Sequence, residues 1–188
     1  VPAPYWVSYL EQIRLAGGTP VVIDGPEQQG FKVTADQIRQ AISPRTKALI
    51  LNSPANPTGA IYTRAELEEI AEVVVARQIP VISDEIYEPF NYTGESHVSI
   101  AQINQDMKAL TLIVHGVSKS YSMTGWRIGY VLGNADVIKA IGSLQSHSTS
   151  NPTSIAQKAA LEALQGPQDS VDKMVSEFAA RREHLVSG

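Results

Sequence analysis

The stretch from residue 47 to residue 84 constrains the fold of this chain more than any other. It opens with the apolar run KALIL at 47–51, which is typical of a buried strand. A capping box, Thr63 with Glu66 three residues later, then predicts the start of a helix. A second apolar run at 79–83 predicts another strand. Such a strand–helix–strand unit predicts two parallel strands joined by a helical crossover, and therefore an α/β fold.

The rest of the chain continues this alternation. Apolar spacing predicts a helix over residues 4–18, and Thr34 with Gln37 forms another capping box. Further strands are expected at 20–24, 109–114 and 127–133. Residues 92–105 are expected to be loop with one short helix. Further helices should follow Asn134 and Pro152 and reach the C-terminus. The pattern predicts a central, mostly parallel sheet with helices on both faces. A hydrophobic content of 43% suffices for the core of one domain over 1–188.

Composition excludes several classes of protein. The chain has no cysteine, so disulfides, thiolate catalysis and cysteine metal sites are excluded, and its histidines show no metal-ligand spacing. With a net charge of −4 and no basic run, nucleic acid is not an expected partner. No apolar run reaches the roughly 18 residues of a membrane helix, and no signal peptide opens the chain. We therefore expect a cytoplasmic protein that binds neither metal nor membrane.

Three polar residues each follow a predicted buried strand: Asn56, Asp84 and Lys119. In open α/β sheets, ligands bind outside the carboxyl ends of the strands. Three such residues at three strand ends therefore predict one shared crevice. The glycine-rich phosphate loop of nucleotide hydrolases and the serine nucleophile elbow are both missing from the sequence.

Lys119 has the surroundings of a reactive amine. It lies just past a buried strand, among small residues, and eight positions before Arg127. A free lysine has a pKa of about 10.4, so freeing its amine at neutral pH costs roughly 4.6 kcal/mol. Burial and a neighbouring cation both lower this pKa, and an arginine is suited to binding a phosphate. The pair predicts a Schiff-base lysine beside a phosphate-binding arginine.

Each candidate residue also has an ordinary structural interpretation. Taken alone, Arg127 is a surface ion-pair partner, and any one lysine is most often a solvated surface residue. Asp84 is as readily a helix cap as a group that holds a proton on a heterocyclic nitrogen. Asn56 is as readily a cap of the NPTG turn. Tyr87 and Trp6 are as readily packed side chains as groups that contact a ring.

The motifs NSPANPTG at 52–59, SDEIYE at 83–88 and GVSKSYSMTGWRIGY at 116–130 together resemble the class I and II aminotransferases of fold type I. These enzymes depend on pyridoxal 5'-phosphate. The resemblance covers nearly the whole chain and points most clearly to bacterial aspartate aminotransferases. It implies that residues 1–188 are the central part of the large cofactor-binding domain.

The resemblance implies roles for residues on the two sides of the cofactor. On the ring side, Asp84 would pair with the pyridinium nitrogen, and Asn56 and Tyr87 would hydrogen-bond the phenolic oxygen. Trp6 would stack on the face of the ring.

At the other end of the cofactor, Lys119 would form the Schiff base and Arg127 would bind the phosphate. The loop at Ser150-Asn151 resembles a segment that approaches the site of a partner subunit. One departure is Gly116, where many relatives have a hydroxyl that helps to hold the phosphate.

The implied reaction is ping-pong transfer of an amino group from an amino acid, here aspartate, to a 2-oxo acid, here 2-oxoglutarate. Lys119, once displaced by the substrate, would move a proton from the substrate α-carbon to the cofactor. Asp84 would keep the ring nitrogen protonated so that the ring accepts electrons. The implied catalytic residues are Lys119, Asp84 and Tyr87, and the implied assembly is a homodimer.

Parts of the family's site fall outside this sequence. Its N-terminal segment and its C-terminal small domain, whose arginine grips the substrate carboxylate, have no counterpart in residues 1–188. The chain also opens on Val1-Pro2 without an initiator methionine and ends within an amphipathic pattern, so both ends read as truncated. We expect residues 1–188 alone to be inactive.

Other interpretations stay open at this point. In one of them the protein is an aminotransferase whose substrate is alanine, an aromatic or another amino acid. In another, the chain is the cofactor-binding sensor domain of a transcription regulator, without turnover. In the last, it is a plain α/β domain in which Lys119 has no special role.

Overall fold

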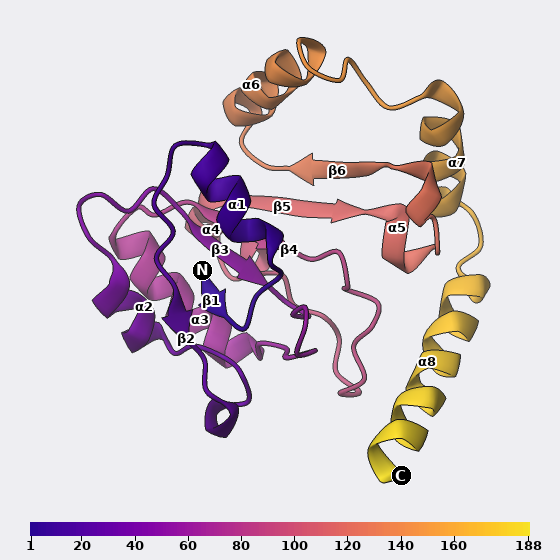
Figure 1. The fold of residues 1–188 in the computed structure, drawn as a ribbon, viewed down its shortest axis with the longest axis horizontal. Helices are drawn as coiled ribbons and strands as arrows, with labels where there is room; N and C mark the ends of the chain where they lie inside the picture. Colours follow the sequence, from indigo (N-terminus) through magenta and orange to yellow (C-terminus); the bar gives the residue numbers. More distant parts are fainter.

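The computed structural model describes residues 1–188 and is built around a four-stranded sheet (Figure 1). In spatial order its strands are β3 (Leu49–Asn52), β4 (Val81–Asp84), β5 (Thr111–Gly116) and β6 (Gly129–Leu132). β3, β4 and β5 are parallel, and β6 is antiparallel to β5. A separate parallel pair consists of β1 (Pro2–Ala3) and β2 (Ile23–Asp24). The predicted α/β fold with a mostly parallel sheet is confirmed.

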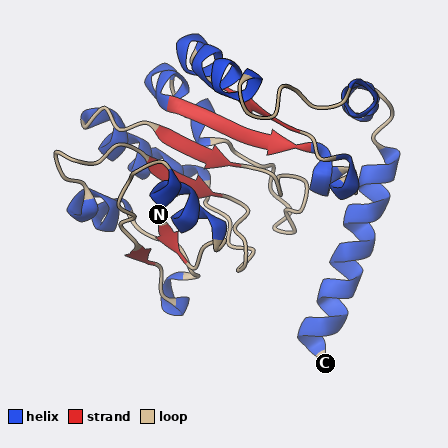
Figure 2. Cartoon of the chain, turned by 45° about the horizontal axis from the view of Figure 1, so that its top comes forward, coloured by secondary structure: helices blue, strands red, loops and turns tan.

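Helices connect and cover the strands, and none of them is both long enough and apolar enough to cross a membrane. The α-helices are α1 (Ser8–Leu15), α2 (Ala35–Ala41), α3 (Arg64–Ala76), α4 (Gln105–Leu110), α5 (Val117–Ser120), α6 (Ala135–Ser146), α7 (Ser154–Gln165) and α8 (Asp169–Ser187). The short 3-10 turns are η1 (Glu27–Gln29), η2 (Ile100–Gln102) and η3 (Thr124–Trp126). Figure 2 shows α8 projecting away from the sheet toward the C-terminus.

Local side chains set where several helices begin, as the sequence predicts. The Thr63 hydroxyl accepts from the Glu66 amide at 3.3 Å, and the Glu66 carboxylate accepts from the Thr63 amide at 2.7 Å. The same reciprocal pair, Thr34 with Gln37, opens α2. Asn134 caps α6 by accepting from the Asp136 amide at 2.9 Å. Both capping boxes and the Asn134 cap are confirmed.

Two segments differ from the sequence prediction. The short helix expected within 92–105 is η2, but the additional helix α4 takes the first two residues of the strand expected at 109–114, and β5 therefore begins at Thr111. Asn104 starts this helix by accepting from the Met107 amide at 2.8 Å. A helix of six residues is too short to show a helical period in the sequence. The strand expected at 20–24 is reduced to its last two residues, β2.

The hydrophobic core lies on one face of the sheet, against α2, α3 and α4. Leu51 and Val81 of the strands pack there with Ile70 of α3. Side chains alternate along a strand, so Asn52 and Asp84 belong to the opposite face. Helix α1 lies on that second face, in front of the sheet in Figure 1. Helices on both faces are thus confirmed, and the polar strand ends are left beside α1.

Candidate active site

The ends of β3, β4 and β5 lie side by side. Asn52 is in register with Asp84, and Asp84 is in register with Val114. The Asn52 side chain donates to the Asp84 carbonyl oxygen at 2.8 Å, and the Ser53 amide donates to the same oxygen at 3.2 Å. The backbone that carries Asp84 is therefore held from the β3 side. The three parallel strands therefore end at one edge of the sheet, and the predicted shared crevice of Asn56, Asp84 and Lys119 stays a prediction.

The Asp84 carboxylate is half-buried and its orientation is fixed by two donors. Oδ2 accepts from the Tyr9 hydroxyl at 2.6 Å, and Oδ1 accepts from the Ile86 amide at 3.2 Å. Burial and then the contact with Asp84 raise the pKa of Tyr9, so its hydroxyl stays protonated and keeps donating. The arrangement keeps a carboxylate in a set direction at the edge of the sheet.

Trp6 is not a core residue, because 41% of its surface is exposed. Its ring meets the ring of Tyr9 edge to face, with the centroids 5.5 Å apart and the planes at 89°. Since Tyr9 contacts Asp84, the indole lies on the same side of the sheet as this carboxylate. An exposed aromatic face here is available to a planar ligand.

Asn56 and Tyr87, which belong to two separate turns, come together with Lys119 of the short helix α5. The Asn56 side chain donates to the Tyr87 hydroxyl oxygen at 3.3 Å. The Lys119 amine, on the short helix α5, lies 5.5 Å from the centroid of the Tyr87 ring. The Asn56 amide in turn donates to Asn52 Oδ1 at 2.8 Å, which ties the NPTG turn to the end of β3. The structure therefore places an amine, a phenol and an amide within one small region.

Arg127 follows η3 and is exposed, with a left-handed backbone φ of 53°. Its guanidinium donates to the Thr124 carbonyl at 2.8 Å and makes no other hydrogen bond or ion pair. Most of its five donors are therefore free to bind an anion. Arg127 also lines an open cavity of about 780 Å³ together with Asn151 and Thr153. No hydrogen bond or ion pair joins Arg127 to Lys119 or to Asp84.

Gly116 has a steric reason to be glycine. A Cβ atom at this position would lie 3.0 Å from Gly129 Cα and 3.2 Å from the Ile128 carbonyl oxygen. Such distances are tighter than ordinary van der Waals contact. The close approach of β5 and β6 explains why a side chain with a hydroxyl is missing here.

Sequence reasoning missed two residues of this region, Tyr9 and Asn52. Tyr9 lies three positions after Trp6, at a spacing that places both side chains on one side of a helix, and this signal was available in the sequence. Asn52 belongs to the NSPANPTG motif, but its partners are backbone groups of Pro54, Asn56 and Asp84, which no residue pattern reveals. No group of three or more histidine, aspartate or glutamate side chains is arranged to hold a metal ion.

Comparison with known proteins shows the family of this chain. The family described as aminotransferase class I and II matches residues 1–188. The aspartate aminotransferase of Bacillus sp. (strain YM-2) is 57% identical over 185 residues, which cover 98% of this chain and 47% of the relative. The aspartate/prephenate aminotransferase of Cereibacter sphaeroides is 50% identical over 188 residues, which cover 100% of this chain and 47% of the relative.

A solved structure shows the same fold. The aspartate aminotransferase from Rhizobium meliloti aligns with a TM-score of 0.96 and 42% identity, over 99% of this chain and 47% of that one. The chain thus spans about half the length of the curated relatives it matches. Because both the family match and the structural match extend over nearly all of its residues, the chain belongs to the class I and II aminotransferase family.

Proposed function

We propose that the protein containing this chain is an aspartate aminotransferase that depends on pyridoxal 5'-phosphate and uses 2-oxoglutarate as its amino acceptor. The observation that carries the proposal is that the Lys119 amine lies 5.5 Å from the centroid of the Tyr87 ring, beside the strand end that carries the oriented carboxylate of Asp84. Family membership and the aspartate named in the relatives' descriptions support the reaction and the substrate.

The residues at the sheet edge fit the cofactor by their chemistry. Asp84 offers a fixed carboxylate to a protonated ring nitrogen. Asn56 and Tyr87 offer two donors to a phenolic oxygen, and the exposed face of Trp6 offers a surface for a ring. The free donors of Arg127 suit a phosphate. When bound, the cofactor supplies an electron sink for the negative charge that develops at the substrate α-carbon.

The side chains then divide the work between binding and proton transfer. Lys119 would hold the cofactor through its amine, and its free amine would act as the general base that takes the proton from the substrate α-carbon. The carboxylate of Asp84 would keep the ring nitrogen protonated. Because the Tyr9 hydroxyl and the Ile86 amide already fix its orientation, this carboxylate need not reorient during the reaction. We also propose a homodimer, because the cavity beside Arg127 and Asn151 is open to a covering partner.

Trapping with borohydride tests the role of Lys119 in the full-length protein. The reagent should fix pyridoxal phosphate irreversibly on wild-type Lys119, and peptide mapping should find the label there. Lys119→Ala should lose the label, whereas Lys108→Ala, which removes an exposed lysine of α4, should keep it. Label on another lysine of the Lys119→Ala variant would refute the assignment.

A second candidate substrate follows from a specific relative, the aspartate/prephenate enzyme of Cereibacter sphaeroides. A panel of acceptors that includes 2-oxoglutarate, prephenate, pyruvate and aromatic 2-oxo acids separates aspartate, prephenate, alanine and aromatic activities. Cofactor binding without turnover on every acceptor would instead favour a sensor domain.

A further inference from the structure

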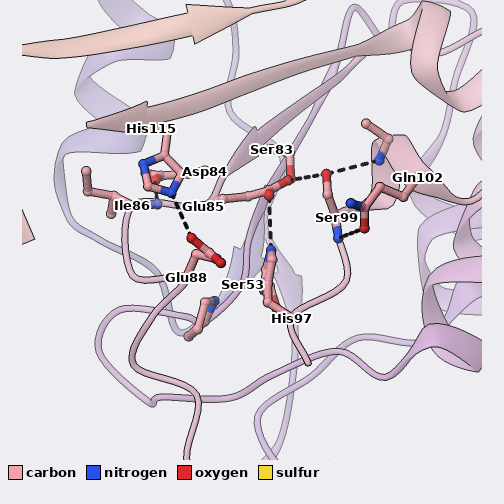
Figure 3. Close-up of polar contacts among 12 residues, drawn as sticks. Ser53, Ser83, Asp84, Glu85, Ile86, Glu88, His97, Ser99, Gln102 and His115 are labelled. Atoms are coloured by element: carbon pink, nitrogen blue, oxygen red, sulfur yellow. Dashed lines mark hydrogen bonds and ion pairs between the residues drawn. The ribbon is translucent and has the colours of Figure 1, made fainter. Parts of the chain in front are cut away.

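A buried carboxylate lies directly behind the candidate site. Glu85 follows Asp84 and is only 5% exposed (Figure 3). Its Oε1 accepts from the hydroxyls of Ser83 and Ser99, both at 2.7 Å, and its Oε2 lies 3.0 Å from His97 Nε2. The carboxylate assigned to the cofactor ring is that of Asp84, so the function proposed above makes no use of this second carboxylate.

The Glu85 network is built to hold a charge. Burial opposes ionisation, but hydrogen bonds from His97, Ser99 and Ser83 outweigh it and lower the pKa of Glu85. His97 takes part through Nε2 alone, because its Nδ1 is buried and has no hydrogen-bond partner. The imidazole is therefore oriented by Glu85 rather than by a second contact.

The backbone of Glu85 connects this network to the candidate site. Its amide donates to the Val114 carbonyl at 2.9 Å, which continues the pairing of β4 with β5. Its carbonyl accepts from the Glu88 amide at 2.9 Å, which closes the turn that carries Tyr87. Any displacement of Glu85 therefore moves the carboxylate before it and the phenol after it.

The other members of the network are anchored in the core. Ser99 begins η2, with its hydroxyl 3.3 Å from the Ala101 amide, and the next residue, Ile100, is 1% exposed. Segment 97–99 is thus a fixed point to which the end of β4 is tied. A carboxylate that bridges a core segment and the site-bearing turn can transmit the rigidity of the core to the site.

We propose that Glu85 is a positioning residue of the aminotransferase reaction, which sets Asp84 and Tyr87 by tying the end of β4 to segment 97–99. This inference rests on the proposed function, because its consequence is the orientation of groups that contact the cofactor. Glu85 itself touches neither substrate nor cofactor, since it lies on the core side of the sheet.

Two glutamine substitutions in the full-length protein test this role. Glu85→Gln keeps the size of the side chain and removes its charge. Glu95→Gln makes the same change on an exposed residue of the loop between Glu85 and Ser99. The measurements are kcat, KM, the dissociation constant of pyridoxal phosphate and the pH midpoint of the visible absorbance of the bound cofactor.

Misplaced contact groups should lower kcat of Glu85→Gln about tenfold, with KM within about twofold of the wild-type value. The absorbance midpoint should move in the same direction as in Tyr87→Phe, because both changes weaken the hydrogen bond that the phenol donates. Glu95→Gln should match the wild type in every measurement. A purely structural role would lower the melting temperature and leave kcat and the midpoint unchanged, and that result would overturn the inference.

Should Glu85→Gln fail to fold, Ser99→Ala takes its place, because it removes one donor and leaves the carboxylate. The same shifts, smaller in size, are expected, and their absence counts against the inference. Failure of the wild type to bind pyridoxal phosphate would overturn the proposed function together with the inference. A wild type that binds it, with Glu85→Gln unaltered, would overturn the inference only.

Discussion

The Tyr9 hydroxyl donates a hydrogen bond of 2.6 Å to Asp84 Oδ2, across a separation of 75 residues in the sequence. This contact joins α1 to the end of β4 on the face of the sheet that the helix covers. Hydrogen bonds to a charged acceptor are shorter and stronger than those between neutral groups. Tyr9 therefore serves both the docking of α1 and the orientation of Asp84.

Tyr9→Phe should weaken both the docking of α1 and the orientation of Asp84. Losing a hydrogen bond to a charged group costs about 1.5–3 kcal/mol of stability, and a less constrained Asp84 should lower kcat about tenfold. Urea unfolding and steady-state kinetics of the full-length protein measure the two effects. Tyr5→Phe is the matched control, because the Tyr5 hydroxyl makes no hydrogen bond. Equal behaviour of the two variants would show that the contact is unimportant.

Asp84→Asn should separate charge from shape. The amide retains an oxygen that can accept from Tyr9, but it has no charge with which to keep a ring nitrogen protonated. We expect kcat to fall by about 10²-fold or more, with a much smaller change in the urea midpoint. Turnover near the wild-type level with unchanged stability would contradict the role proposed for Asp84.

The capping boxes at the starts of α2 and α3 allow a test of pH dependence at Glu66. Burial opposes its ionisation, but hydrogen bonds from Lys32 and Thr63 outweigh it and lower the pKa of Glu66 from 4.5. A group with a lowered folded pKa stabilises the protein above its unfolded pKa, and this contribution is lost as the pH falls through the folded pKa. Glu66→Gln should preserve the capping box, as Gln37 does in α2, and remove only the ion pair with Lys32.

The stability difference between Glu66→Gln and the wild type should therefore depend on pH. It should be about 0.2–1 kcal/mol at pH 7, since the Glu66 side chain is 37% exposed and screened by solvent. It should disappear as the pH falls below 4.5 and through the lowered pKa. Urea unfolding at a series of pH values measures it, with Glu69→Gln on the exposed surface of α3 as the control. A difference that stays constant down to acid pH would exclude the ion pair as its source.

The sequence predicts those features that depend on local rules. Thr63 and Glu66 define a helix start by themselves, and Asn56, Asp84 and Lys119 reach one edge because parallel strands end together. The roles of these residues toward a cofactor stay predictions. Contacts between distant side chains, such as Tyr9 with Asp84 or Ser99 with Glu85, depend on how helices dock and leave no periodic trace. The short helix α4 was not predicted for a related reason, because its six residues form less than two helical turns and show no period in the sequence.

Residues 1–188 expressed alone should self-associate and fail to transaminate. Leu144 of α6 and Ile155, which belongs to α7, are each 73% exposed, and β6 has no partner on its outer side. Exposed apolar side chains beside an open sheet edge favour association between copies. Size-exclusion chromatography with light scattering tests the first expectation, and an assay from aspartate to 2-oxoglutarate tests the second. A stable monomer, or turnover equal to that of the full-length protein, would contradict them.

The same glycine-to-alanine change should have opposite effects at Gly116 and Gly142. At Gly116 the new methyl group would meet Gly129 Cα at 3.0 Å, so β5 and β6 must separate slightly or lose stability. We expect a loss of about 1–3 kcal/mol. Gly142 lies inside α6, and a methyl group there meets nothing within 4 Å. Alanine loses less backbone freedom than glycine when a helix forms, so Gly142→Ala should gain about 0.5–1 kcal/mol. Urea unfolding measures the stability of both variants. A Gly116→Ala variant as stable as the wild type would show that the close approach of β5 and β6 is not what requires glycine at position 116.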